Sequence, residues 1–197
     1  MLLLTGSLAG CSAGGGADGD TTSSGDPLPG SAGDTLPPAA ERPPAPDGRE
    51  CAMAPVTGRG IGDVSIGMSL DDLRSRCTVT GDTTVQGPEG QPSRVLRVAM
   101  GGETVDVEVA DDRVWRIPVT DPDMRTADSL GVGTPVAKLL ELPGAAPAMG
   151  EGTYVMSPAH CGISFQLRGA GVVRTVEELR KLPGAVAVER MLVTGCD

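Results

Sequence analysis

The sequence predicts an α+β domain in which a mostly antiparallel sheet carries short helices packed on one face. Three short segments have helical apolar spacing with start and stop signals. Between them lie runs in which apolar and polar residues alternate, as in half-buried strands. The connections between these runs are short, which favours hairpins over parallel crossovers and therefore an antiparallel sheet.

Each helical segment starts with a candidate N-cap residue, and the three expected caps are Ser69, Thr134 and Thr175. Pro135 stands where the first helical residue of the second segment is expected, which is a favourable position for proline. Glu178 follows Thr175 by three residues, which is the spacing of a capping box. The second and third segments each end at a Pro-Gly pair.

Six segments predict strands: 94–100, 104–110, 113–119, 161–167, 186–193 and, more weakly, 153–156. The first three are joined by Gly101-Gly102 and Asp111-Asp112, which predict tight turns and a three-stranded meander.

An internal repeat aligns Ile66–Leu73 with Val132–Leu139, each with a glycine, a capping region and a helix ending in leucine. Either the domain consists of two tandem helix-plus-β-meander modules, or two similar helix starts arose independently. The stretch Val64–Leu73 resembles the apolar-x-Ile/Val-Gly-Met-Thr/Ser signature of such modules in small outer-membrane assembly lipoproteins and β-lactamase-inhibitory proteins. The resemblance extends loosely to Leu130–Leu142, but Arg76-Cys77-Thr78 replaces the usual Leu-Gly-x-Pro. It implies binding of a protein partner rather than catalysis.

The amino-terminal segment 1–10 predicts a signal peptide, because a short apolar run ends in small residues. Leu8–Cys11 resembles the lipobox of bacterial lipoproteins, although no basic residue precedes the apolar run. The resemblance implies that Cys11 is the acylated first residue of the mature protein, anchored in the cell membrane or outer membrane. The alternative is an apolar end with an unrelated cysteine.

Residues 11–50 predict a disordered linker rich in glycine, serine and proline, which leaves 51–197 as the extracytoplasmic α+β domain. The net charge of −10 and the presence of one Trp, one Tyr and one Phe make nucleic acid, anionic lipid headgroups and carbohydrate poor partners.

The four remaining cysteines predict two disulfide bonds in an exported domain. We favour the pairs Cys51–Cys77 and Cys161–Cys196. The alternatives are Cys51–Cys196 with Cys77–Cys161, and Cys51–Cys161 with Cys77–Cys196.

Catalysis, a metal and a cofactor are not expected. His160 is the single histidine, and we interpret it as a solvated loop residue before a strand. Asp121, Asp123 and Asp128 lack the spacing of a calcium loop, and the first two indicate a turn.

The segment 113–133 concentrates arginine around the one tryptophan. Strand alternation places Trp115 in the core with Ile117 and Val119. The competing hypothesis is that Trp115, Arg116 and Arg125 line a partner-binding face, because Trp and Arg are common at interface hot spots. The sequence thus predicts a membrane-tethered protein-binding or envelope-assembly module, with an envelope enzyme or small-ligand-binding protein as the alternative.

Overall fold

The computed structural model describes residues 49–86 and 92–196, all within one compact unit, Pro43–Asp197. Cys11, the expected signal segment and nearly all of the expected linker lie outside the described residues. Within the described ranges, none of the helices is long and apolar enough to cross a membrane.

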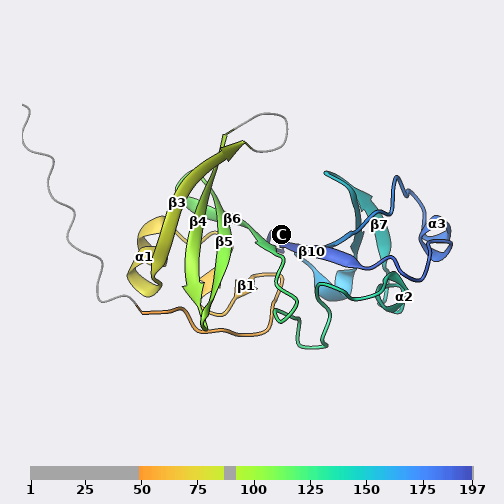
Figure 1. The fold of residues 1–197 in the computed structure, drawn as a ribbon, viewed down its shortest axis with the longest axis horizontal. Helices are drawn as coiled ribbons and strands as arrows, with labels where there is room; N and C mark the ends of the chain where they lie inside the picture. The colour runs from red at the N-terminus through yellow and green to blue at the C-terminus, as the bar shows by residue number, and fades with distance from the viewer. Residues whose placement is uncertain (1–48, 87–91, 197) are drawn as a thin grey trace, which may run out of the picture. The chain divides into compact units, whose positions relative to one another are not determined.

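An eight-stranded antiparallel sheet dominates the fold (Figure 1), and its strand order is β3-β4-β5-β6-β10-β9-β8-β7. Its strands are β3 (Val79–Gln86), β4 (Pro92–Met100), β5 (Glu103–Ala110), β6 (Arg113–Val119), β7 (Ala146–Met149), β8 (Thr153–Met156), β9 (Ile163–Leu167) and β10 (Val188–Val193). A separate two-stranded sheet pairs β1 (Gly60–Ile61) with β2 (Val64–Ser65). The expected antiparallel α+β class is confirmed, while β1, β2, β3 and β7 were not anticipated.

The helices are short: α1 (Leu70–Arg76), α2 (Val136–Leu139), η2 (Pro158–His160) and α3 (Val176–Arg180). Ser69 caps α1, and Thr175 with Glu178 forms the expected capping box of α3. The expected Thr134 cap is wrong, because Pro135 is the N-cap of α2 and the Thr134 hydroxyl accepts a hydrogen bond from the Gly131 amide.

The sheet consists of two four-stranded meanders whose last strands, β6 and β10, pair with each other. We call residues up to Val119 the first half and the later residues the second half. Each half runs from a helix into four consecutive strands, with α3 inserted before β10. The junction is narrow, since Ile117, Pro118 and Val119 are the β6 residues paired with β10.

One face of the sheet is buried in a continuous apolar core. Leu96 of β4, Val107 of β5, Met191 of β10 and Phe165 of β9 are fully buried. The buried helix residues Leu73, Leu139 and Leu179 belong to the same cluster. The side chains at the alternate strand positions therefore project from the opposite face of the sheet.

Two disulfide bonds join the pairs favoured from the sequence. Cys51 is bonded to Cys77, with their Cα atoms 4.9 Å apart, and Cys161 to Cys196, with their Cα atoms 5.4 Å apart. The first bond ties the start of the described domain to the C-cap of α1.

Candidate functional site

The sheet face opposite the core carries a row of polar and charged side chains from both halves. We call this surface the polar face; its residues are Arg97, Asp106, Glu108, Arg116, Pro118 and Arg190. Along β4, β5 and β6 they alternate with buried core residues, and on β10 Arg190 lies between the exposed Glu189 and the buried Met191. The sheet geometry alone therefore brings residues distant in sequence onto one surface.

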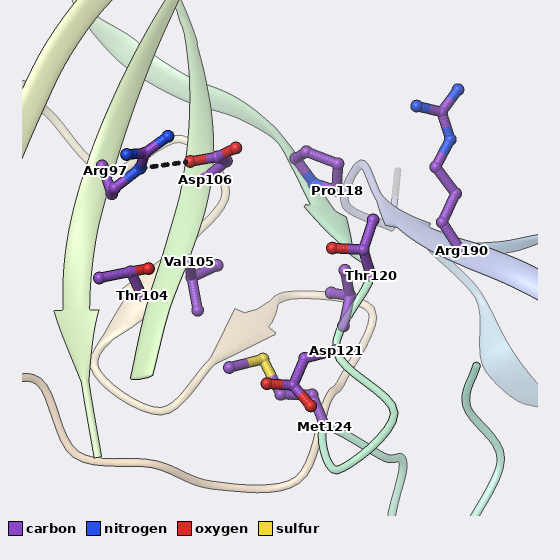
Figure 2. Close-up of a pocket in the computed structure, with 10 residues that line it drawn as sticks. Arg97, Thr104, Val105, Asp106, Pro118, Thr120, Asp121, Met124 and Arg190 are labelled. Carbon is purple, nitrogen blue, oxygen red and sulfur yellow. Dashed lines mark hydrogen bonds and ion pairs between the residues drawn. The ribbon is translucent and has the colours of Figure 1, made fainter. Parts of the chain in front are cut away.

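Two adjoining depressions hollow the polar face. One has a volume of about 320 Å³ and is bordered by Thr104, Asp121 and Arg190 (Figure 2). The other has a volume of about 300 Å³ and extends to Thr83 and Val95 of the strands at the sheet edge. Both are lined by Arg97, Asp106 and Pro118. Because they share these residues, the depressions form one groove.

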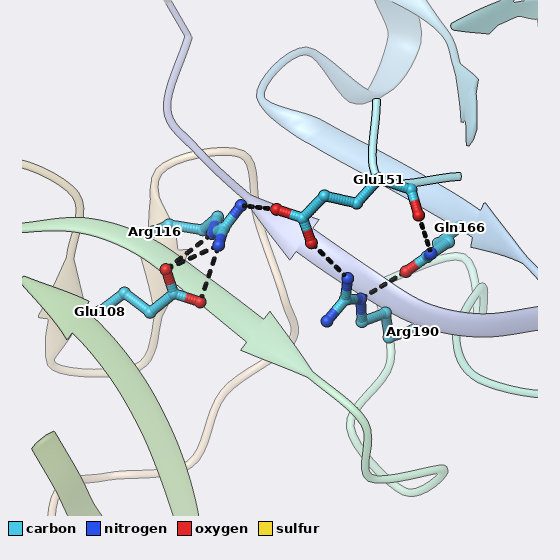
Figure 3. A network of polar contacts seen from close by, with 5 residues as sticks. All are labelled: Glu108, Arg116, Glu151, Gln166 and Arg190. Carbon is cyan, nitrogen blue, oxygen red and sulfur yellow. Dashed lines mark hydrogen bonds and ion pairs between the residues drawn. The ribbon is translucent and has the colours of Figure 1, made fainter. Parts of the chain in front are cut away.

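Glu108 and Arg116 form the best-buried ion pair of the polar face. The Arg116 guanidinium donates to both Glu108 oxygens, at 2.9 and 3.0 Å, and the side chains are 13% and 12% exposed for Arg116 and Glu108 (Figure 3). Burial by itself would lower the pKa of Arg116, but hydrogen bonds and charge from Glu108 and Glu151 raise it above its usual value. Arg116 is therefore a fixed cation.

Glu151, in the turn between β7 and β8, connects this pair to the second half of the sheet. One of its carboxylate oxygens accepts from Arg116 Nη1 at 3.3 Å and the other from Arg190 Nη2 at 3.0 Å (Figure 3). Arg190 Nε also donates to the Gln166 side chain. The resulting network of Glu108, Arg116, Glu151, Arg190 and Gln166 spans the junction between β6 and β10.

Trp115 lies at the surface, so its expected place in the core is wrong. A β-bulge makes Trp115 an extra residue on β6, because Arg116 pairs with Glu108 while Val114 pairs with Val109. The bulge breaks the alternation and leaves Trp115 41% exposed. The Arg116 guanidinium carbon lies 4.6 Å from the centre of the indole ring, in a cation–π contact.

Arg125 has a different environment from Trp115 and Arg116. Its guanidinium donates to the carbonyl oxygens of Ser129 and Val132, at 3.1 and 3.4 Å. Its own carbonyl accepts from the Val56 amide. Arg125 therefore stabilises the connection between the two halves. Of the three residues expected on a partner-binding face, Trp115 and Arg116 contact each other, whereas Arg125 makes its hydrogen bonds within the loop between β6 and α2.

His160 is more enclosed than the sequence suggested. Its side chain is 15% exposed, its Nε2 lies 3.0 Å from an Asp128 carboxylate oxygen, and its ring packs edge-on against Phe165. The Thr126 hydroxyl donates to Asp128, and this bond, with the charge of His160, holds the pKa of Asp128 below its usual range. The expectation of a solvated histidine is therefore wrong. The contact between His160 and Asp128 connects η2 to the loop between β6 and α2.

The other acidic residues of that loop form a turn. The Asp121 carboxylate accepts from the Asp123 amide at 2.8 Å, as a turn-forming aspartate does. Asp128 is engaged instead by Thr126 and His160.

Apart from Arg116, the residues of the polar face and its network were not predicted from the sequence; they are Arg97, Asp106, Glu108, Pro118, Glu151, Gln166 and Arg190. The alternation of β4 could have placed Arg97 on the polar face. The position of Glu151 depends on how the two halves meet, for which the sequence contains no local signal.

The fold and the groove together define a two-half antiparallel sheet domain with one polar, hollowed face. No protein-family model and no curated protein sequence matches the chain. Among solved structures, the chain is similar to the uncharacterized protein yfeY from Escherichia coli, at 15% identity and a TM-score of 0.50. The match covers 72% of this chain and 99% of the yfeY chain, and it shows a shared fold.

Proposed function

We propose that this protein is a lipid-anchored, extracytoplasmic binding module that holds a protein partner on the polar face of its sheet. Acylation of Cys11 would anchor the chain in a bacterial membrane, and the linker would let the domain reach its partner. The role is binding or assembly in the cell envelope rather than catalysis. In this proposal the helices pack on the core side only and leave the polar face to the partner.

The groove is the observation on which the proposal rests. It crosses strands of the first half and reaches Arg190 of the second. Its charged border residue Glu108 is held in place by the largely buried ion pair with Arg116. Binding to such a preorganised surface requires less ordering of side chains, which favours specific association.

Trp115 supports the proposal as a candidate anchor at the edge of this surface. The chain has only one tryptophan, and the bulge on β6 exposes 41% of it to solvent. An exposed tryptophan stacked with arginine is typical of interface hot spots. Trp115 is linked to the groove through its contact partner Arg116, because Arg116 binds Glu108 and Glu108 lines the groove.

We also infer that the domain consists of two tandem helix-plus-β-meander modules. The glycines of the repeat, Gly67 and Gly133, have the same φ angle, 82° and 83°. The following helix starts also match, since the Leu70 amide donates to Asp112 and the Val136 amide donates to Val186. This agreement supports the resemblance to modules that bind proteins.

A capture experiment with the full-length, lipidated chain tests the proposed function. Envelope proteins retained by the wild-type chain are identified, and each candidate is then purified and titrated against Trp115→Ala. The matched control is Val172→Ala, which removes an exposed apolar side chain (67% exposed) from the loop before α3. We expect Trp115→Ala to weaken binding at least about tenfold and the control to leave it unchanged. Equal binding by both variants would contradict the proposal.

A further inference from the structure

We propose that Arg116 and Arg190 form a receptor for a single carboxylate group of the protein partner, and that Glu151 occupies this receptor in the free chain. The inference rests on the proposed function, because it assigns a partner chemistry to the same polar face.

The two guanidinium groups belong to different halves of the sheet and meet at one carboxylate. Glu151 divides its oxygens between them, with contacts of 3.3 Å to Arg116 and 3.0 Å to Arg190. A carboxylate that bridges two arginines satisfies both oxygens with charge-assisted hydrogen bonds. The position between Arg116 and Arg190 is therefore matched to the shape and charge of a carboxylate.

Both arginines have other partners that hold them in place when Glu151 leaves. Glu108 binds Arg116 through two nitrogens, and Gln166 accepts a hydrogen bond from Arg190 Nε. These partners lie on β5 and β9, strands adjacent to β6 and β10. The strands of the sheet therefore hold both arginines, and one further contact reaches the turn that carries Glu151, because Gln166 Nε2 donates to the Glu151 carbonyl at 3.5 Å.

Glu151 is the member of the network that a competitor can replace. It comes from the turn between β7 and β8, and its side chain is 32% exposed, against 13% for Arg116. Gly150 and Gly152 flank it and contribute no side chain that would anchor the turn. Its contact with Arg116 is also the longest ion pair of the network.

The overall charge of the chain restricts the partner further. A net charge of −10 repels a long acidic segment, while a lone Asp, Glu or C-terminal carboxylate gains the contacts with both arginines. The adjoining groove is lined by Arg97, Asp106 and Asp121 as well as by Pro118 and Met124, so it offers both charged and apolar contacts beside that carboxylate. We therefore assign the partner one acidic residue that binds the two arginines, in a segment that is not acidic as a whole.

Acetate is the probe for this receptor, titrated as sodium acetate against matched sodium chloride into the full-length protein. The NMR signals of arginine Nε and Cζ report binding. In Glu151→Gln the glutamine keeps the size of the side chain but frees the two guanidinium groups from a competing charge. We expect acetate to shift the Arg116 and Arg190 signals saturably in this variant, at concentrations about tenfold lower than in the wild type.

Two further variants complete the experiment. Glu177→Gln changes an exposed glutamate of α3 that pairs with Lys181, and it should behave as the wild type. Glu151→Gln combined with Arg190→Gln should lose the gain in acetate affinity. If Glu151→Gln keeps the wild-type spectrum elsewhere but binds acetate no better than the wild type, the inference is overturned.

The failure of this inference is distinguishable from failure of the proposed function. A partner that needs Trp115 but is indifferent to acetate and to Glu151→Gln would overturn the carboxylate receptor and leave the binding module standing. Acetate binding at the two arginines without any Trp115-dependent partner would support the receptor and overturn the proposed function.

Discussion

Gly67 and Gly133 occupy the same position in the two halves of the sheet. The amide of Gly67 donates to the carbonyl of Val114 at 2.7 Å, and the amide of Gly133 donates to that of Val188 at 2.8 Å. Each glycine thus connects the segment before a helix to the last strand of its own meander. The two final strands then pair at the centre of the sheet.

Replacing either glycine with alanine should destabilise the domain by a similar amount. Both have a positive φ, and a Cβ atom at either position would meet no neighbour, so the cost is backbone strain alone, about 1 kcal/mol. Urea unfolding of the Gly67→Ala and Gly133→Ala variants measures it. Gly184→Ala is the control, because that site is equally open and lacks the positive φ. Unequal losses at the two glycines would contradict their equivalence.

The Glu108–Arg116 pair should contribute far more stability than the Arg97–Asp106 pair of the same face. Removing one partner of the largely buried pair, in Arg116→Ala, leaves Glu108 without its main counter-charge and should cost about 2 kcal/mol. In the exposed pair, with side chains 62% and 49% exposed, Arg97→Ala should cost less than about 0.5 kcal/mol. Chemical denaturation gives the free energy of unfolding of both variants. Equal losses in Arg116→Ala and Arg97→Ala would contradict the prediction.

The contribution of Asp128 to stability should disappear at low pH. Hydrogen bonding from Thr126 and the charge of His160 lower its folded-state pKa, so its contribution is complete above the ordinary aspartate pKa of about 3.9. It is then lost as the pH falls through the lower folded-state value. Asp128→Asn should cost about 1 kcal/mol at pH 7, a figure limited by the exposure of the carboxylate. A difference between the two proteins that persists unchanged to pH 2 would count against this assignment.

Removal of the disulfide bond between Cys51 and Cys77 should destabilise the folded domain. Cys51 and Cys77 are separated by 26 residues, and replacing both with serine should cost about 3 kcal/mol by releasing this loop in the unfolded chain. Thermal unfolding with and without reductant measures the loss. A double variant that melts at the wild-type temperature under oxidising conditions would show that the bond does not stabilise the domain.

Local patterns predicted most of the secondary structure, while the exceptions have physical causes. Strands β4, β5 and β9 follow clear alternation, and the caps at Ser69 and Thr175 were recognisable. Strand β3 was missed because Gly81 and Asp82 interrupt its alternation, and its register is irregular at the same place. Strand β7 is short and contains Pro147, which is unusual inside a sheet.

The site was less predictable because it depends on contacts between the two halves. The bulge that exposes Trp115 arises from the pairing of β6 with β5 and leaves no mark in the alternating sequence. The groove requires β10 beside β6, a pairing between segments about 70 residues apart that no local pattern indicates. The sequence contains the acidic residues and arginines of the polar face, but no local pattern predicts that they come together on one surface.

The most direct test of the central claim is site-specific photo-crosslinking in the native envelope. A photoreactive amino acid replaces Thr104, an exposed residue at the border of the groove, and in a matched protein it replaces Glu177 on α3. We expect one envelope protein to be crosslinked from position 104 and to be absent from the products of position 177. Crosslinking of the same proteins from both positions, or from position 177 alone, would contradict a partner bound on the polar face.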